Sequence, residues 1–312
     1  MDRIRRQSRL GLICQFLRDI CCMDIRPRRS VLYMPGANVR AMQKAKELSS
    51  DALIFDLEDS VSVDSKSIAA RQGFDMIESV DYGYRELIVR VNHIDSEWGS
   101  DEIATFARAK VDALLFPKVE RVDDLTEILS RLDRAGGGHI PVWIMVETAK
   151  AVLNIERLVS YSDRINCLVM GTTDLINEVR GQHETARSNL SYSLQKTLLA
   201  ARAFGLDAID GVHLDFKDLS SFREICQQGK IIGYDGKTLI HPSQIDIAND
   251  VFGYSSDEIE RAEQIIDAWE KAESLGKGVA VVDGQLIESL HVESAKRIRE
   301  SYRIIELRTN AD

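Results

Sequence analysis

Short apolar runs alternate with amphipathic stretches along most of the chain. Eight of these runs are rich in Val, Ile and Leu and nearly continuous in apolar character, as is typical of parallel strands that are buried on both faces. They predict strands at 30–34, 52–57, 87–91, 113–116, 142–146, 167–170, 208–211 and 238–240. Connecting helices are expected at 38–48, 64–80, 101–110, 122–134, 149–160 and 191–204. The alternation predicts an α/β fold of the TIM (β/α)8 barrel type.

The pattern changes after His241-Pro242, because a longer amphipathic helix is expected at 256–275 and another at 288–307. Between them a short apolar segment leads into a turn at Asp283-Gly284. This tail is too large for one barrel unit and too small to fold alone, so we expect a C-terminal helical extension that packs on the barrel or on a neighbouring subunit. The predicted domains are an N-terminal extension at 1–28, the barrel at 29–254 and the C-terminal extension at 255–312.

Residues 1–28 are rich in arginine and precede the first predicted strand. Three interpretations compete for this segment: an upstream start codon assigned in place of Met23, a disordered or helical arm, and a transit-like peptide.

Composition restricts the class of partner. The 312 residues carry a formal net charge of -10, which argues against a nucleic-acid partner. No apolar run approaches the ~20 residues that a membrane-spanning helix needs, so no membrane partner is expected. The five cysteines are odd in number and lack zinc-type spacing, which predicts a reduced protein of the cytoplasm without a disulfide framework.

Charged residues recur at or just after the ends of the predicted strands. They are Lys44, Glu58, Asp59, Arg90, Lys118, Glu147 and Asp174. In a barrel of parallel strands these ends meet at one mouth, which is where barrel enzymes carry out their chemistry. The pattern therefore predicts an enzyme.

Glu147 and Asp174 form the sharpest pair, because each follows an apolar strand closely and the two strands are expected to be neighbours. Two carboxylates, with the remaining positions left to water and substrate, are the arrangement that Mg²⁺ prefers. The alternative is that each acid caps the helix that follows its strand.

Arg90 lies between valines in a strand, so its guanidinium must reach a carboxylate or the barrel mouth. A bidentate clamp for an anionic substrate is one role for it, and an ion pair with Glu58 or Asp59 is the other. The two-residue period of a strand places Asp56 and Glu58 on one face. We expect this acidic cluster to support the metal or Arg90.

Lys118 follows a strand end and is expected to neutralise that cluster. A Schiff-base role competes, but a lysine among several carboxylates is expected to stay protonated. His213 and His241 also follow strands, and we expect no more of them than a position at the rim of the barrel. The chain has no GxGxxG after the first strand, no Walker loop, no GxSxG and no HExxH, so nicotinamide chemistry, NTP hydrolysis and serine esterase activity are unsupported.

Nine segments together resemble a known enzyme family: RSVLYMPG, ALIFDLEDSV, IVRVN, LLFPKVE, VETAKAVLN, VMGTTDL, AIDGVHLDF, DGKTLIHPSQI and VAVVDGQLIE. In this order they resemble the citrate lyase beta subunit-like branch of the HpcH/HpaI aldolase superfamily. The segments DYGYRELIVRVN, DSEWG and GTTDL look most like the malyl-CoA lyase and (3S)-malyl-CoA thioesterase group.

The resemblance implies a Mg²⁺-dependent barrel enzyme, a homotrimer or hexamer, that acts on CoA thioesters of hydroxy acids. It assigns the metal to Glu147 and Asp174 and substrate binding to Arg90. It also implies that Asp283 enters the site of a neighbouring subunit and that Lys44 lies near the CoA phosphates.

One departure concerns the first loop. Relatives often carry arginine directly after PG-x, whereas this chain has Asn38 there and Arg40 two residues later. The contacts with the CoA phosphates, including one from Arg40, are therefore expected to be rearranged.

The expected reaction is cleavage of a malyl-CoA-type thioester to acetyl-CoA or propionyl-CoA and a 2-oxo acid such as glyoxylate. Arg90 would stabilise the enolate and Asp283 would handle the proton, with Glu58, Asp59 and Lys118 completing the site. Three alternatives remain: hydrolysis of the same thioester with water activated by Asp283, a component of a larger lyase complex, and an aldolase of free 2-oxo acids. Lys44 and Arg40 disfavour the last of these.

Overall fold

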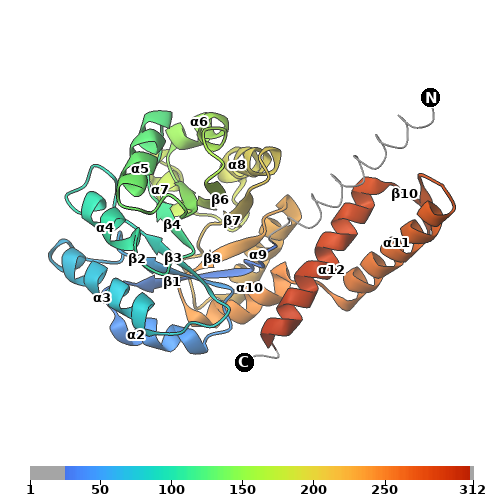
Figure 1. Cartoon of the computed structure of the whole chain (residues 1–312), viewed down its shortest axis with the longest axis horizontal. Helices are drawn as coiled ribbons and strands as arrows, with labels where there is room; N and C mark the ends of the chain where they lie inside the picture. Colours follow the sequence, from blue (N-terminus) through green and yellow to red (C-terminus); the bar gives the residue numbers. More distant parts are fainter. Residues whose placement is uncertain (1–24, 310–312) are drawn as a thin grey trace. The chain divides into compact units, whose positions relative to one another are not determined.

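The computed structural model describes residues 25–309, and Figure 1 shows a ring of strands surrounded by helices. Eight parallel strands pair in sequence order, and β8 pairs with β1 to close the barrel. The strands are β1 (Ser30–Pro35), β2 (Ala52–Asp56), β3 (Glu86–Arg90), β4 (Ala113–Phe116), β5 (Val142–Val146), β6 (Ile165–Met170), β7 (Asp207–Asp210) and β8 (Gly236–Leu239). The predicted (β/α)8 barrel is confirmed.

Helices pack around the outside of the barrel and connect its strands. They are α2 (Val39–Lys44), α3 (Lys66–Ser79), α4 (Gly99–Phe106), α5 (Val122–Arg134), α6 (Ala149–Val159), α7 (Thr172–Glu178), α8 (Ser191–Ala203), α9 (Leu219–Ile232) and α10 (Ile245–Phe252). Three of them, α7, α9 and α10, have no counterpart in the predicted ranges. Seven residues are too few for a helical period to emerge in α7, whereas α9 buries a face that contains Phe222, Ile225 and Cys226.

Two apolar layers separate the inside of the barrel from its outside. Alternate strand residues fill the interior, for example Ile54 and Trp143, while their neighbours, for example Phe55 and Ile144, pack against the helices. Because side chains fill the interior, a substrate can approach only at a rim of the barrel.

Arg28 closes the amino-terminal end of the barrel. Its Nε and Nη2 donate to Glu86 at 2.7 Å each, and Nη1 donates to Asp207 at 2.5 Å. The guanidinium also lies 4.9 Å from the centre of the Trp143 ring. Arg28 therefore belongs to the barrel unit and joins the first residues of β3 and β7.

Replacing Arg28 with alanine is expected to lower the free energy of unfolding by about 3–5 kcal/mol, because two acidic side chains lose a buried partner. Urea denaturation measures this change. Arg134→Ala is the control, since Arg134 is 66% exposed and lies 3.5 Å from Glu127, and it should change that free energy by less than about 0.5 kcal/mol. Equal effects of the two substitutions would contradict the role of Arg28.

Among the described residues, 25–27 and 254–309 form a second compact unit, distinct from the barrel unit of Arg28–Gly253. It contains α11 (Ser256–Ser274), an antiparallel hairpin of β9 (Ala280–Val282) and β10 (Gln285–Ile287), and α12 (Ser289–Thr309). Ala272, Val282, Ile287 and Val292 pack together in its core. Asp283 occupies the hairpin turn with a φ of 49°, in the left-handed region.

Some expectations concern residues that the structure does not describe: the N-terminal segment 1–24 with its candidate start Met23, and Cys14, Cys21 and Cys22. Within 25–309, Cys167 and Cys226 are buried free thiols. No helix in this range has the length and apolar character needed to span a membrane.

Candidate active site

Charged side chains converge at the carboxyl end of the barrel. Asp56 and Arg90 are the last residues of β2 and β3 and are partners in the strand register. Lys118 lies two residues beyond β4, and Glu147 directly follows β5. The parallel register therefore brings these groups to one rim.

Arg90 pairs most closely with Asp56. Its Nε and Nη2 donate to the two oxygens of Asp56 at 2.6 and 2.7 Å, and its Nη1 lies 2.9 Å from Glu58 and 3.3 Å from Asp59. Burial opposes ionisation of Asp56, but Arg90 outweighs it, and the pKa of Asp56 lies below its ordinary value. Asp56 therefore occupies Nε and Nη2 of Arg90, and only Nη1 of Arg90 faces Glu58 and Asp59.

Glu58 bridges two cations. One oxygen accepts from the Lys118 ammonium at 2.8 Å and the other lies beside Arg90. Burial raises the pKa of Glu58 above its ordinary value, and the two cations oppose this shift. Burial works against the charged form of Lys118, but Glu58 outweighs it and the pKa of Lys118 is raised. A protonated Lys118 agrees with the argument against a Schiff base.

The backbone of Lys118 supports Glu147. Lys118 has a φ of 53°, a left-handed conformation that costs a residue with a side chain about 1–2 kcal/mol. In this conformation its N–H donates to Glu147 Oε1 at 2.8 Å. Glu147 Oε2 faces Gly171, where a Cβ would come within 2.9 Å of it. Glycine at this position leaves room for that oxygen.

Glu147 is a strongly perturbed acid. Burial raises its pKa to about 8, the negative charges of Glu58 and Asp174 add to this shift, and Lys118 and Arg90 oppose it. Asp174 is half-buried in the first turn of α7. Two carboxylates that repel each other at a rim fit a divalent cation, and an all-oxygen donor set fits Mg²⁺. Among residues 25–309 no three or more Asp, Glu, His or Cys side chains gather as a metal site, so the protein would supply two carboxylates here and leave the other positions to water and substrate.

The capping alternative is wrong for both acids. Thr148 caps α6, where its hydroxyl accepts from the backbone N–H of Ala151 at 3.1 Å, and Glu147 precedes this cap. The N-cap of α7 is Gly171, so Asp174 lies inside the helix. Neither carboxylate is explained by helix capping.

The raised pKa of Glu147 predicts how stability depends on pH without metal. Between the ordinary value of 4.5 and about 8 the folded protein retains a proton that the unfolded chain has lost, so rising pH destabilises it. Glutamine does not titrate. In EDTA, Glu147→Gln should therefore gain stability relative to wild type as pH rises through this window. Urea denaturation at several pH values tests this, and a pH-independent difference would contradict it.

The other predicted site residues are exposed on the barrel unit or belong to the C-terminal unit. Arg40 and Lys44 are exposed on α2, where Asn38 caps the helix. Asp283 lies in the C-terminal unit, where it pairs with Arg261. His241 is exposed and stacks on Phe216 with the ring centres 4.7 Å apart.

Tyr33 and Lys66 also contact this cluster, although the sequence pattern does not single them out. The Tyr33 ring lies 5.0 Å from the Arg90 guanidinium, and Lys66 binds the backbone of the segment that follows β2. A tyrosine inside a strand gives no signal of its own. Lys66 is one charged residue near the start of an amphipathic helix, and such residues are usually exposed.

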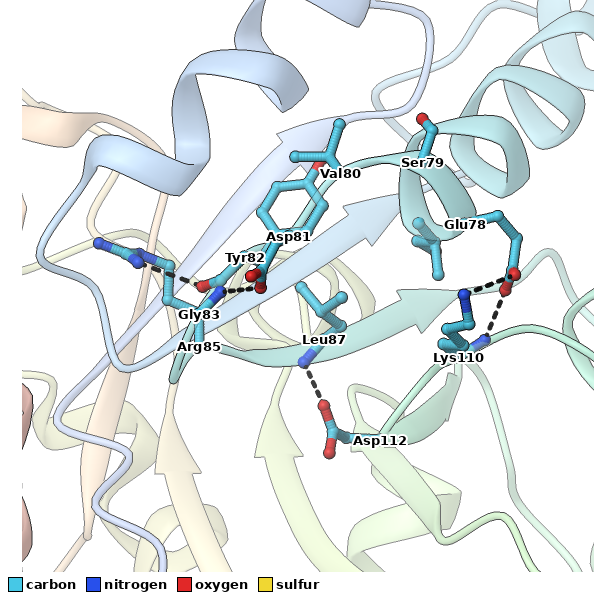
Figure 2. Close-up of a pocket in the computed structure, with 11 residues that line it drawn as sticks. Glu78, Ser79, Val80, Asp81, Tyr82, Gly83, Arg85, Leu87, Lys110 and Asp112 are labelled. Atoms are coloured by element: carbon cyan, nitrogen blue, oxygen red, sulfur yellow. Dashed lines mark hydrogen bonds and ion pairs between the residues drawn. The ribbon is translucent and has the colours of Figure 1, made fainter.

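A hollow of about 420 Å³ lies at the opposite end of the barrel, where α3 ends and β3 and β4 begin (Figure 2). Its charged groups have structural partners: Lys110 binds Glu78 through its backbone N–H and its ammonium, and Asp112 accepts from the backbone N–H of Leu87 at 2.8 Å. These contacts hold element ends together, so we do not assign the active site to this hollow.

Comparison with known proteins gives the family. Residues 29–242 match the family described as HpcH/HpaI aldolase/citrate lyase. The chain belongs to this family. The match covers the barrel, and it confirms the resemblance that the motifs predict. The family is one of enzymes, so the chain carries an enzyme fold with its charged cluster at the end where barrel enzymes have their sites.

Three relatives illustrate the range of this family. The (3S)-malyl-CoA thioesterase of Cereibacter sphaeroides is 46% identical over 87% of this chain and 93% of that protein. Citrate lyase subunit beta of Escherichia coli K12 is 29% identical over 88% and 92%. The solved structure of a citrate lyase beta subunit from Mycobacterium tuberculosis, complexed with oxaloacetate and magnesium, matches with a TM-score of 0.62 at 25% identity over 72% of this chain and 96% of that chain.

Proposed function

We propose that this protein is a Mg²⁺-dependent enzyme of malyl-CoA-type thioesters and that it hydrolyses the thioester bond. The relative that is 46% identical over nearly its whole length, a (3S)-malyl-CoA thioesterase, supports the substrate class and the reaction. The observation that carries the metal-dependent chemistry is the buried Glu147, with its raised pKa, beside Asp174 at the barrel mouth.

Glu147 and Asp174 would hold the ion. When bound, Mg²⁺ would supply Lewis-acid polarisation of the oxygens of the malyl group. A relative was solved in complex with oxaloacetate and magnesium, which supports a site that takes both a divalent ion and a small dicarboxylate. Lys118 keeps Glu147 in place through its N–H, and the lack of a Cβ at Gly171 leaves space for the Glu147 side chain.

Arg90 would orient the substrate. Its Nε and Nη2 stay on Asp56, whereas Nη1 also reaches Asp59, which is 61% exposed and lies at the longer distance of 3.3 Å. A substrate oxygen that carries negative charge can take the place of Asp59 at Nη1. In the reaction this N–H would stabilise the charge that develops on the thioester carbonyl oxygen.

Asp283 would act as the general base from a neighbouring copy of the chain. It takes a proton from the attacking water, the C–S bond breaks, and the thiolate of CoA leaves. The support is its exposed position at a hairpin turn, together with apolar side chains exposed near it, Val281, Leu286 and Leu290. We propose that this surface docks on a second copy in a homotrimer or hexamer.

Carbon-carbon cleavage is the second candidate. Citrate lyase beta subunits match the chain along most of their length, and the same residues would serve that reaction. Arg90 would then stabilise the enolate of acetyl-CoA or propionyl-CoA, and Asp283 would return the proton to its carbon. The two reactions differ in whether water reaches the thioester.

Incubation of the purified chain with (3S)-malyl-CoA, with and without Mg²⁺, distinguishes these reactions. Hydrolysis releases free thiol and malate without glyoxylate, whereas cleavage releases glyoxylate and acetyl-CoA without free thiol. Methylmalyl-CoA and citramalyl-CoA extend the test to other acyl chains. Turnover by the chain alone would exclude a need for partner chains, and no turnover of any of the three thioesters would refute the proposed function.

The two buried free thiols, Cys167 and Cys226, suit a reducing compartment, and we propose a cytoplasmic enzyme.

A further inference from the structure

Lys66 is a buried lysine that binds the segment carrying Glu58. It is the first residue of α3 and only 6% exposed. Its ammonium donates to the carbonyls of Leu57 and Glu58 at 2.9 and 2.6 Å, and to Asn92 Oδ1 at 2.7 Å. A lysine has three N–H donors, so these contacts use all of them.

This position is unfavourable for a lysine. The amino terminus of a helix carries the positive end of the helix dipole, which repels a cation. Burial of an ammonium group is also costly, and its three bonds go to neutral oxygens. Glu102 hydrogen-bonds to Asn92, and it and Asp56 act on the Lys66 ammonium only through space. The contacts of Lys66 with the segment that carries Glu58 are the best explanation for a lysine at this buried position.

The segment after β2 is held from two sides. Lys66 binds its carbonyl oxygens, and the Asp56 carboxylate accepts from the backbone N–H groups of Glu58 and Ser60 at 2.9 and 3.1 Å. The backbone of Glu58 is thereby fixed at both its N–H and its C=O. Its side chain leaves this fixed point to reach Arg90 and Lys118.

We propose that Lys66 is a positioning residue for the active site. It fixes Glu58 so that one carboxylate oxygen faces Arg90 and the other faces Lys118. The ion pair of Glu58 with Lys118 in turn holds the residue whose N–H binds Glu147. The inference rests on the proposed function, because it assigns this chain of contacts to the site that binds Mg²⁺ and the thioester.

Two substitutions separate positioning from simple filling of space. Lys66→Met keeps the length and apolar stem but removes the donors, and kcat should fall about 10- to 100-fold with KM changed less than about threefold. Lys66→Arg keeps donors and should retain more of the kcat. If Lys66 only filled space, methionine would be tolerated and the bulkier arginine would not. Lys110→Met, at the other end of the barrel, is the control and should leave kcat unchanged.

Crystal structures of the Lys66 variants give a readout that does not depend on activity. In Lys66→Met, Glu58 should lose its ion pairs with Arg90 and Lys118. If Lys66→Met does not fold, Lys66→Ala, which also removes the donors, replaces it with the same expectations. An unchanged Glu58, or an unchanged kcat with methionine, would overturn the proposal. A wild-type protein without turnover would refute the proposed function, and the position of Glu58 would still decide the role of Lys66.

Discussion

Glu147→Gln is expected to reduce kcat on the order of 10³-fold and to abolish the response to Mg²⁺. Glutamine keeps the shape and the oxygen that accepts the Lys118 N–H, but it lacks the negative charge that attracts a divalent cation. Steady-state kinetics with varied Mg²⁺ measure the effect. The loss is expected to be large because Glu147 is one of the two carboxylates that are proposed to hold the ion.

The matched control is Glu127→Gln on α5. Glu127 is 47% exposed and pairs with Arg131 four residues later, so its loss should leave kcat unchanged. Circular dichroism should show both variants folded. A Glu147→Gln enzyme with near-normal kcat and an intact response to Mg²⁺ would refute the assignment of Glu147 as a metal ligand.

Mixing two inactive variants is expected to restore activity. Asp283→Ala removes the proposed base, and Glu147→Gln removes the proposed metal ligand. If each site takes Asp283 from a neighbouring copy, random assembly from equal amounts leaves about a quarter of the sites with both wild-type residues. Co-expression of the two variants and comparison of kcat with each variant alone measure the recovery.

The matched mixture is wild type with Asp283→Ala, in which about half of the sites should be complete. Full activity of Asp283→Ala alone would mean that Asp283 plays no part, and a lack of recovery in the mixture of two inactive variants would mean that it acts within its own chain. Because apolar side chains are exposed around the hairpin, we expect this surface to dock on a second copy of the chain.

The barrel was predictable because each buried parallel strand leaves a short apolar run in the sequence. The rim was predictable for the same reason, since Arg90, Lys118 and Glu147 lie at or just after the ends of such runs. Some observed strand ends differ from the predicted ones by one or two residues. For example, β8 begins at Gly236 and not at Thr238, because Lys237 is itself a buried strand residue. A lysine in that position resembles a loop residue until its partner, Asp210, is known.

The partners of the ion pairs were less predictable than the positions of the charged residues in the fold. The sequence suggested Glu58 or Asp59 for Arg90, whereas the register of β2 and β3 sets Asp56 directly opposite and gives it two of the three guanidinium nitrogens. Strand register is a property of the folded sheet. Arg28 shows the same limit, because its partners Glu86 and Asp207 are 58 and 179 residues away in the sequence.

The site in this account depends on one divalent ion held by Glu147 and Asp174. Crystals grown with Mn²⁺ in place of Mg²⁺ test this most directly, because the anomalous signal of Mn²⁺ locates the ion. We predict a peak between the two carboxylates, with one oxygen from each bound to it. No peak there, with the two side chains turned apart, would contradict the account.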